Sequence, residues 1–414
     1  MPVVLLLIFL VISSAGCQII PFDPGMTSDP ADSASVQTSV LTPDDRNGPG
    51  SSETGGTSGN SVMETTTTRK QVTETGPAGE DLLIGQLQVM SLDNKIGQLI
   101  MAGYNTTAEA EQIIRDISPG GLILFRRNIR TEQQTRQDIS SLQGAVAEGL
   151  PSLFIAVDQE GGVISRLPAS AGSFESAMEI GLRADVAYAI ASGEKTGRVL
   201  HEWGFNVNCA PVLDIGGNPD NKVIGTRAYG QTADEVIVYG LAVLQGLQNA
   251  GMLAVIKHFP GHGDTATDSH LALPVIDQPL AQLQEEALRP FIAAFAAGAD
   301  MVMMAHIQFS QLDTRPASLS PVLVDALLRR DLGFAGIVLT DDLTMGAITD
   351  HYELGEAAVM AVEAGCDLLL VCHDIANVYL VRDALMAAAR SGRLSEARID
   401  ASVRRILLAK SRLP

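Results

Sequence analysis

The sequence predicts one closed parallel barrel, an α/β fold of the (β/α)8 TIM type, over residues 81–414. Two observations predict it: eight short apolar runs recur at a steady interval, and stretches with helical periodicity lie between them. Most of the runs are apolar at successive positions, which is typical of strands that a parallel sheet buries on both faces. Such an alternation fits a closed barrel, with an open doubly wound sheet as the alternative.

The elements follow from the length and period of each segment. Apolar runs of about four to eight residues predict strands, and longer amphipathic stretches predict helices. The expected strands are Gln98–Ala102, Gly121–Phe125, Leu153–Val157, Asn206–Leu213, Leu253–Lys257, Met301–Ala305, Ile337–Thr340 and Leu368–Cys372. The expected helices are Thr107–Ile117, Gln133–Ala147, Ala184–Glu202, Ala233–Ala250, Leu280–Gly298, Pro321–Leu332, Leu354–Ala364, Ile375–Ser391 and Glu396–Lys410.

Residues 1–17 have the composition of an export signal. Residues 3–12 form an apolar run of signal-peptide length, and Ser13-Ser14-Ala15-Gly16-Cys17 follows it. Small residues before a cysteine resemble a bacterial lipoprotein cleavage site, although no Lys or Arg precedes the run and Ser14 stands where Leu is usual. We expect lipid attachment at Cys17 and a location on the outer face of the cytoplasmic membrane. Secretion with an ordinary signal peptide and an uncleaved anchor are the alternatives.

Residues 18–80 are rich in Ser, Thr, Gly, Pro and Asp, with 51–59 as the plainest tract. A segment of this composition buries too little apolar surface to offset its conformational entropy. We therefore expect a disordered linker. A flexible chain of about 60 residues reaches on the order of 40 Å, enough to hold a domain away from a membrane.

Charge and cysteine content exclude several classes of function. The net charge is −20, and no run of Lys or Arg is longer than a pair. Nucleic-acid binding needs a basic face, so we expect no nucleic-acid partner. The four cysteines, Cys17, Cys209, Cys366 and Cys372, have neither metal-ligand nor redox-motif spacing. The last three lie in or beside apolar runs, and we expect them to be core thiols.

Polar residues follow five of the expected strands. In a (β/α)8 barrel the loops after the strands build the active site, so these residues are expected to meet at one mouth. They are Asp158-Gln159-Glu160-Gly161-Gly162, Asp214, Lys257-His258, His306 and Asp341-Asp342. Acidic residues at such a mouth favour glycoside or phosphate chemistry, and the absence of a Gly-rich phosphate loop weakens the second.

The Asp341-Asp342 pair provides a candidate nucleophile. Glycosidases need a nucleophile or base and a proton donor on either side of one bond. Asp341 directly follows a strand and is well placed for the first role. Asp342 faces the other way if the strand geometry continues, and capping the next helix is its better explanation.

Residues 257–270 contain three His, two Asp and one Lys, interrupted by Pro260 and Gly261. Asp268 and His270 are spaced so that the carboxylate can bond the imidazole and raise its basicity, which suits a general acid/base. A pair of solvated loop residues is the plain alternative. A zinc site is the other alternative, but the histidines match no helical zinc motif.

Several ordered blocks of the sequence resemble family 3 glycoside hydrolases, in the β-N-acetylhexosaminidase branch. The resemblance covers residues 85–414. The blocks that carry it are Lys257-His258-Phe259-Pro260-Gly261-His262-Gly263, Asp268-Ser269-His270, Met90-Ser91-Leu92, Lys95-Ile96-Gly97-Gln98-Leu99, Gly121-Leu122-Ile123-Leu124-Phe125, Asp158-Gln159-Glu160-Gly161-Gly162, Ala210-Pro211-Val212-Leu213-Asp214, Pro316-Ala317-Ser318-Leu319-Ser320 and Thr340-Asp341-Asp342-Leu343-Thr344-Met345. The sequence departs from the family at Val163, where related sequences often have Arg.

The resemblance implies a role for each matching residue. Asp341 is expected to be the nucleophile, and His270 the general acid/base with Asp268 as its partner. The residues expected to hold the innermost sugar are Asp158, Arg166, Arg227, Lys257 and His258. His306 is a weaker candidate for the same pocket, with a structural role as the alternative.

The expected function is removal of terminal β-linked N-acetylglucosamine with retention, by double displacement. Cell-wall muropeptides are the expected substrates because the chain is expected to be exported. No metal or cofactor is expected, and the protein is expected to be a monomer. The alternatives are a β-glucosidase or xylosidase of the same family and a non-catalytic lipoprotein that binds wall sugars.

Overall fold

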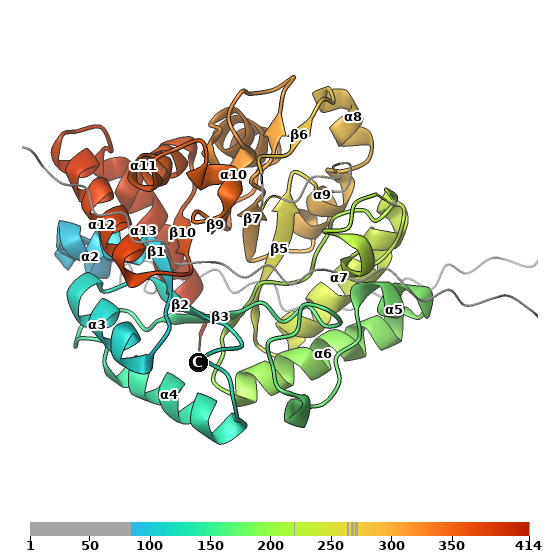
Figure 1. The fold of residues 1–414 in the computed structure, drawn as a ribbon, viewed down its shortest axis with the longest axis horizontal. Coiled ribbons are helices and arrows are strands. Elements are labelled where there is room, and N and C mark those ends of the chain that lie inside the picture. Colours follow the sequence, from blue (N-terminus) through green and yellow to red (C-terminus); the bar gives the residue numbers. More distant parts are fainter. Residues whose placement is uncertain (1–83, 219, 263–264, 266–268, 270–271, 414) are drawn as a thin grey trace, which may run out of the picture. The chain divides into compact units, whose positions relative to one another are not determined.

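The computed structural model describes residues 84–218, 220–262, 265, 269 and 272–413 (Figure 1). The expected signal segment 1–17, the linker 18–80 and Cys17 lie outside the described residues. None of the described helices combines the length and the apolar composition needed to cross a lipid bilayer.

Eight parallel strands close into a barrel, which confirms the predicted fold class. The strands are β1 (Ile100–Gly103), β2 (Gly121–Leu124), β3 (Phe154–Val157), β4 (Val207–Asn208), β5 (Leu253–Phe259), β7 (Met301–Met304), β9 (Ile337–Asp342) and β10 (Leu368–Val371). Each strand pairs with the next along the chain, and β10 closes the ring against β1. Two short strands, β6 (Val275–Ile276) and β8 (Gln308–Phe309), form a separate small sheet.

Helices surround the strands in Figure 1, as a (β/α)8 barrel requires. The α-helices are α2 (Leu92–Gln98), α3 (Thr107–Ile117), α4 (Glu132–Gly144), α5 (Ala177–Leu182), α6 (Val186–Glu202), α7 (Ala233–Asn249), α8 (Leu280–Glu285), α9 (Arg289–Ala296), α10 (Gly346–Thr349), α11 (Leu354–Ala364), α12 (Ile375–Arg390) and α13 (Glu396–Lys410). Ser, Thr or Asp side chains cap the amino ends of most of the longer helices, including α3, α4, α6, α7, α12 and α13.

Three elements differ from the prediction. The expected helix Leu280–Gly298 is two helices, α8 and α9, because Pro290 has no amide hydrogen to continue one helix and instead lies in the first turn of α9. The expected helix Pro321–Leu332 is a π-helix over Val322–Asp331. Strand β4 is only two residues long, although single hydrogen bonds continue along 209–213 to both neighbouring strands.

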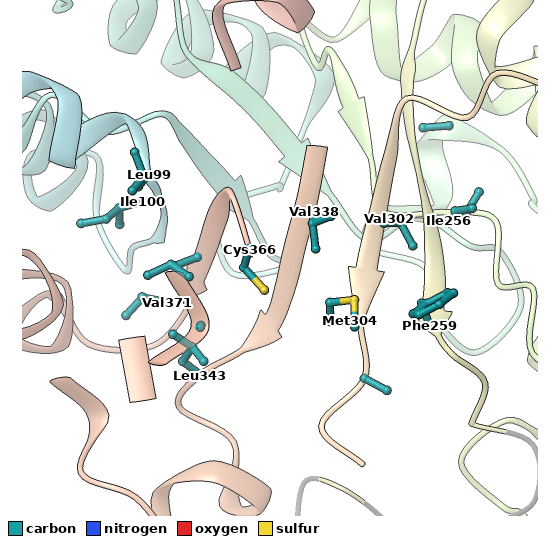
Figure 2. Packing of buried hydrophobic residues seen from close by; sticks show 14 of the residues in the cluster. Leu99, Ile100, Ile256, Phe259, Val302, Met304, Val338, Leu343, Cys366 and Val371 are labelled. Atoms are coloured by element: carbon teal, nitrogen blue, oxygen red, sulfur yellow. The ribbon is translucent and has the colours of Figure 1, made fainter. Parts of the chain in front are cut away.

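The core consists of two layers separated by the strands. Successive side chains alternate along each strand, so Met301 and Met303 face the barrel interior while Val302 packs toward the helices. Figure 2 shows Ile256, Val302 and Val338 side by side on β5, β7 and β9 in this outer layer. The continuous apolar runs of the sequence are therefore explained by burial on both faces.

The interior layer also receives residues from α13. Ile406 and Ala409 join the interior cluster, and the buried Lys410 donates to Gln98 Oε1 at 2.8 Å. Gln98 precedes β1, so α13 meets the barrel at the amino ends of its strands. The predicted site residues lie at the opposite, carboxyl ends. Cys209, Cys366 and Cys372 are buried free thiols, as expected.

Candidate active site

Three predicted site residues lie at interior-facing positions at the carboxyl ends of their strands, in the mouth of the barrel. Interior-facing residues occupy every second position of β3, β5 and β9. Continuing that alternation to the carboxyl end of each strand leads to Asp158, Lys257 and Asp341. Strand geometry therefore directs these three side chains toward the barrel axis.

A buried ion network forms the base of the site. Lys257 Nζ lies 2.6 Å from Asp158 Oδ1 and 2.7 Å from Glu160 Oε1. On the other side of Glu160, Arg227 Nε and Nη2 each donate to a carboxylate oxygen at 2.8 Å. Cations and carboxylates alternate, and we call these four residues the floor network. It joins three of the residues predicted to hold the sugar.

Mutual pairing keeps the floor network charged. Burial alone would raise the pKa of Glu160, but Lys257 and Arg227 lower it to about 2. Burial disfavours the charged form of Lys257, yet Asp158 and Glu160 raise its pKa above the ordinary value. Glu160 likewise outweighs burial and raises the pKa of Arg227. Glu160, Lys257 and Arg227 therefore stay charged at the base of the mouth.

His258 is held in one tautomer by its neighbours. Its Nδ1 donates to Asp214 Oδ2 at 2.6 Å, and its Nε2 lies 3.3 Å from Arg227 Nη2. Arginine has no acceptor, so Nε2 must carry the lone pair in the neutral ring. Burial alone would raise the pKa of Asp214, but His258 and the other donors around it hold the pKa below its ordinary value.

The Asp341 carboxylate, the predicted nucleophile, is half-buried at the end of β9. Its Oδ1 accepts the backbone amide of Asp342 at 2.8 Å. Burial alone would raise the pKa of Asp341, but the nearby imidazoles, that amide and Lys257 hold it below its ordinary value. A carboxylate that stays ionised and directed into the mouth is suited to nucleophilic attack.

Asp342 does not cap a helix, which corrects the sequence-based explanation. Helix α10 has Met345 at its N-cap position. The Asp342 carboxylate instead accepts the amide and the hydroxyl of Thr344 at 3.0 and 2.7 Å and the amide of Cys372 at 3.2 Å. It thus ties the end of β9 to the end of β10 and fixes the backbone next to Asp341.

His306 has the structural role that was its alternative. Its Nε2 donates to the carbonyl oxygen of Asp342 at 3.0 Å, and its Nδ1 accepts the Ser318 hydroxyl at 2.7 Å. Burial lowers the pKa of His306, which favours the neutral ring that this pattern requires. Both ring nitrogens are occupied by protein, so His306 positions the end of β9.

Arg166 enters the mouth from the loop after β3. Gln159 shapes this loop, because its Oε1 accepts the amides of Arg166 at 2.8 Å and Leu167 at 3.1 Å. The Arg166 guanidinium carbon lies 5.9 Å from the centre of the Phe125 ring. Its Nε is buried without a hydrogen-bond partner among the described residues. Val163, the departure from the family pattern, is 71% exposed in a tight turn of the same loop.

The Asp268–His270 pair lies outside the described residues, so the acid/base assignment stays a prediction. Ser269 between them is described and buried. Its carbonyl oxygen accepts the amide of Ala347 in α10 at 3.1 Å, and α10 begins four residues after β9 ends. The loop after β5 therefore contacts the segment that follows Asp341.

Among residues whose placement is described, no three His, Cys, Asp or Glu side chains converge on a possible metal position.

Sequence reasoning placed Glu160 and Asp214 at the mouth but gave neither a role. Their signal was a carboxylate within the first few residues after a predicted strand, and pairing with Arg227, Lys257 and His258 explains why each carboxylate is shielded from solvent.

Comparison with known proteins identifies the family. Residues 91–409 match the description "Glycosyl hydrolase family 3 N terminal domain". The chain belongs to glycosyl hydrolase family 3. The resemblance inferred from the sequence blocks is therefore confirmed.

Named relatives of this family 3 chain are hexosaminidases. Beta-hexosaminidase A of Pseudoalteromonas piscicida is 34% identical over 335 residues, which cover 74% of this chain and 55% of that protein. The beta-hexosaminidase of Xylella fastidiosa is 35% identical over 300 residues, which cover 70% and 87%. A solved family 3 β-N-acetylglucosaminidase from Paenibacillus aligns with a TM-score of 0.76 at 44% identity, covering 78% of this chain and 62% of that one. The chain thus spans less than two thirds of the first and third proteins.

Proposed function

We propose that the protein is a retaining β-N-acetylhexosaminidase that removes terminal N-acetylglucosamine, with Asp341 as its nucleophile. The observation that carries the proposal is an ionised, half-buried carboxylate at the barrel mouth, next to a floor of fixed charges. Family membership and the names of the relatives support the sugar. In most retaining glycosidases a carboxylate bonds the anomeric carbon, and Asp341 has the position for this role.

The reaction has two balanced displacements. In the first, an Asp341 oxygen bonds the anomeric carbon while the bond from that carbon to the leaving oxygen breaks, and His270 gives this oxygen its proton. In the second, His270 removes a proton from water, the water oxygen bonds the anomeric carbon, and the Asp341 carboxylate leaves. The contact of Ser269 with Ala347 supports a proton donor on this side of the barrel.

The floor network would bind the sugar rather than react with it. Asp158 is the more exposed of the two carboxylates paired with Lys257, at 19% of its side chain against 6% for Glu160. Asp158 therefore has oxygen atoms available to sugar hydroxyls, whereas Glu160 serves to hold Lys257 and Arg227. Fixed charged groups of this kind strengthen hydrogen bonds to hydroxyls in a site closed to water.

Replacement of Asp341 tests the nucleophile. Asp341→Asn keeps the shape of the side chain and removes its charge, and we expect turnover of an aryl N-acetyl-β-glucosaminide to fall by about 1,000-fold or more. The exposed Asp350, at the end of α10, provides a matched control as Asp350→Asn. Undiminished turnover by Asp341→Asn would contradict the assignment. Faster turnover of aryl glucoside than of the N-acetylglucosaminide would instead favour the β-glucosidase alternative.

We also propose that the protein acts outside the cytoplasm on peptidoglycan fragments, attached to the membrane through a lipid on Cys17. The apolar run at 3–12 and the small residues before Cys17 support this proposal. Labelled palmitate should enter the wild-type protein and not Cys17→Ser. Label in both proteins, or in neither, would contradict lipid attachment at Cys17.

A further inference from the structure

A cluster of arginines surrounds one phenylalanine at the barrel mouth. Phe125 directly follows β2 and continues its interior-facing series, packing against the interior cluster as a half-buried ring. The guanidinium carbon of Arg127 lies 4.6 Å from the ring centre and that of Arg166 5.9 Å. The His373 ring stacks on Phe125 with centres 6.0 Å apart and planes at 28°. These groups come from the ends of β2, β3 and β10.

Arg126 extends this cluster toward the loop after β3. It is exposed, and its Nη2 donates to the carbonyl oxygen of Ser165, next to Arg166, at 2.9 Å. Arg127 donates to the carbonyl oxygens of Tyr104 and Cys372, each at 2.9 Å. We call Arg126, Arg127 and Arg166, together with His373 and the Phe125 ring, the cationic rim.

The charges of the rim are not compensated by carboxylates. Within the described part of the chain, Arg126, Arg127 and Arg166 form no ion pair, and the guanidinium groups of Arg126 and Arg127 donate to backbone oxygens. His373 is the only member beside a carboxylate among the described residues, with its Nε2 3.2 Å from Asp342 Oδ2. The guanidinium groups of Arg127 and Arg166 lie at one ring and repel each other, and Arg126 adds a third positive charge beside Arg166. These charges lie in a chain of net charge −20, where acidic partners are plentiful.

The rim lies where the leaving group of the proposed reaction would bind. Asp342, which His373 contacts, adjoins the nucleophile Asp341, and Arg166 is shared with the expected sugar pocket. A ligand that reaches the rim while its sugar lies on the floor network must extend from that sugar. Guanidinium groups bind carboxylates with two parallel hydrogen bonds, and Phe125 offers an apolar face beside them.

We propose that the cationic rim is a binding site for a carboxylate on the leaving group and selects substrates that carry one. This inference rests on the proposed function, because the leaving group is that of the reaction at Asp341. Arg126, Arg127 and His373 read the charge on the far side of the scissile bond, whereas the floor network holds the sugar and Arg166 lies between the two. Arg126 and His373 are its specificity residues for the leaving group.

Two aryl substrates test the proposal. The probes are the 4-carboxyphenyl glycoside of N-acetyl-β-glucosamine and its methyl ester, which differ at the rim by one negative charge. Their different intrinsic reactivities cancel when the acid-to-ester ratio of kcat/KM is compared between variant and wild type. We expect this ratio to fall about 3- to 10-fold in Arg126→Gln and in His373→Gln, the size of one partly exposed charged hydrogen bond.

Arg115→Gln is the matched control, because Arg115 is exposed on α3 and pairs only loosely with Glu111 at 3.9 Å. An unchanged ratio in both rim variants would overturn the proposal, as would an equal fall in the control. A 4-phosphonophenyl glycoside that wild type prefers to the carboxylate would overturn the carboxylate assignment in favour of a phosphate site. Absence of turnover of the neutral ester by wild type would instead contradict the proposed function.

Discussion

The floor network and the cationic rim contain similar residues in opposite electrostatic states. On the floor, Lys257 is buried, Arg227 is only 12% exposed, and every charge has a partner within 3 Å. At the rim, Arg126 and Arg127 are exposed and donate to backbone oxygens. Burial explains the difference, since an unpaired charge inside the barrel would be far more costly than one at its edge.

This contrast separates two tasks within one mouth. Paired, buried charges hold a fixed geometry and stay charged whether or not a sugar is bound. Unpaired charges at an edge gain a partner only when a ligand supplies one. On the proposed function, the floor would be preorganised for the sugar that every substrate shares, and the rim would distinguish between leaving groups.

The largest effect is expected from Glu160→Gln. The substitution leaves Lys257 and Arg227 buried with an uncompensated charge, which should lower the free energy of unfolding by about 3 to 5 kcal/mol. Activity should fall by about 100-fold or more because Lys257 loses its position. Urea denaturation and kcat/KM on an aryl N-acetylglucosaminide measure both. Glu148→Gln, which changes an exposed residue, is the control. Similar stability of Glu160→Gln and Glu148→Gln would show that the floor is not a coupled network.

Acid should weaken the floor and not the rim. The pKa of Glu160 is lowered from 4.5 to about 2, so its contribution to stability is complete above pH 4.5 and is lost as the pH falls toward 2. We expect the free energy of unfolding of wild type to exceed that of Glu160→Gln by less at pH 2.5 than at pH 6. Denaturation at both pH values measures this difference. A constant gap would mean that Glu160 does not titrate as the network requires.

Asp214→Asn should have a moderate effect on catalysis. The amide side chain cannot hold His258 Nδ1–H with a charge, and we expect kcat/KM to fall about 10- to 100-fold through loss of one charge-assisted hydrogen bond. Steady-state kinetics on an aryl N-acetyl-β-glucosaminide measure this change. Kinetics equal to those of wild type would place Asp214 outside the sugar site.

The smallest effect is expected from salt. Exposed charges are screened over about 10 Å at 0.1 M ionic strength, whereas buried pairs are screened much less. The test is to raise the salt concentration about tenfold, from roughly 0.05 to 0.5 M. This change should lower kcat/KM for the 4-carboxyphenyl glycoside a few-fold and leave kcat/KM for its methyl ester nearly unchanged. Equal salt sensitivity of the two substrates would remove the distinction between floor and rim.

The sequence predicted the barrel because its strands are buried on both faces and therefore read as apolar runs. It also predicted the mouth residues Asp158, Lys257 and Asp341. Each is a polar residue at the carboxyl end of its strand, two positions after an interior-facing apolar residue. The split at Pro290 was missed because α8 and α9 keep one apolar periodicity across the break. Pairing between distant segments was not predictable, as with Glu160 and Arg227, which lie 67 residues apart.

Two other outcomes show the same limit. Asp342 read as a helix cap from its local context, but its carboxylate bonds the Cys372 amide on the next strand. The rim arginines are unremarkable as single residues, and Arg127 and Arg166 meet at Phe125 only because β2 and β3 lie side by side. The roles of Asp268 and His270 remain predictions, because both lie outside the described residues.

Covalent trapping tests the central claim, that Asp341 is the nucleophile, most directly. A 5-fluoro N-acetylglucosaminyl fluoride should glycosylate the enzyme, and the resulting covalent adduct should hydrolyse only slowly. Proteolysis with mass spectrometry would then locate the bound sugar. We predict that the adduct lies on Asp341. An adduct on Asp158 or on any other carboxylate, or inactivation without an adduct on Asp341, would contradict the account.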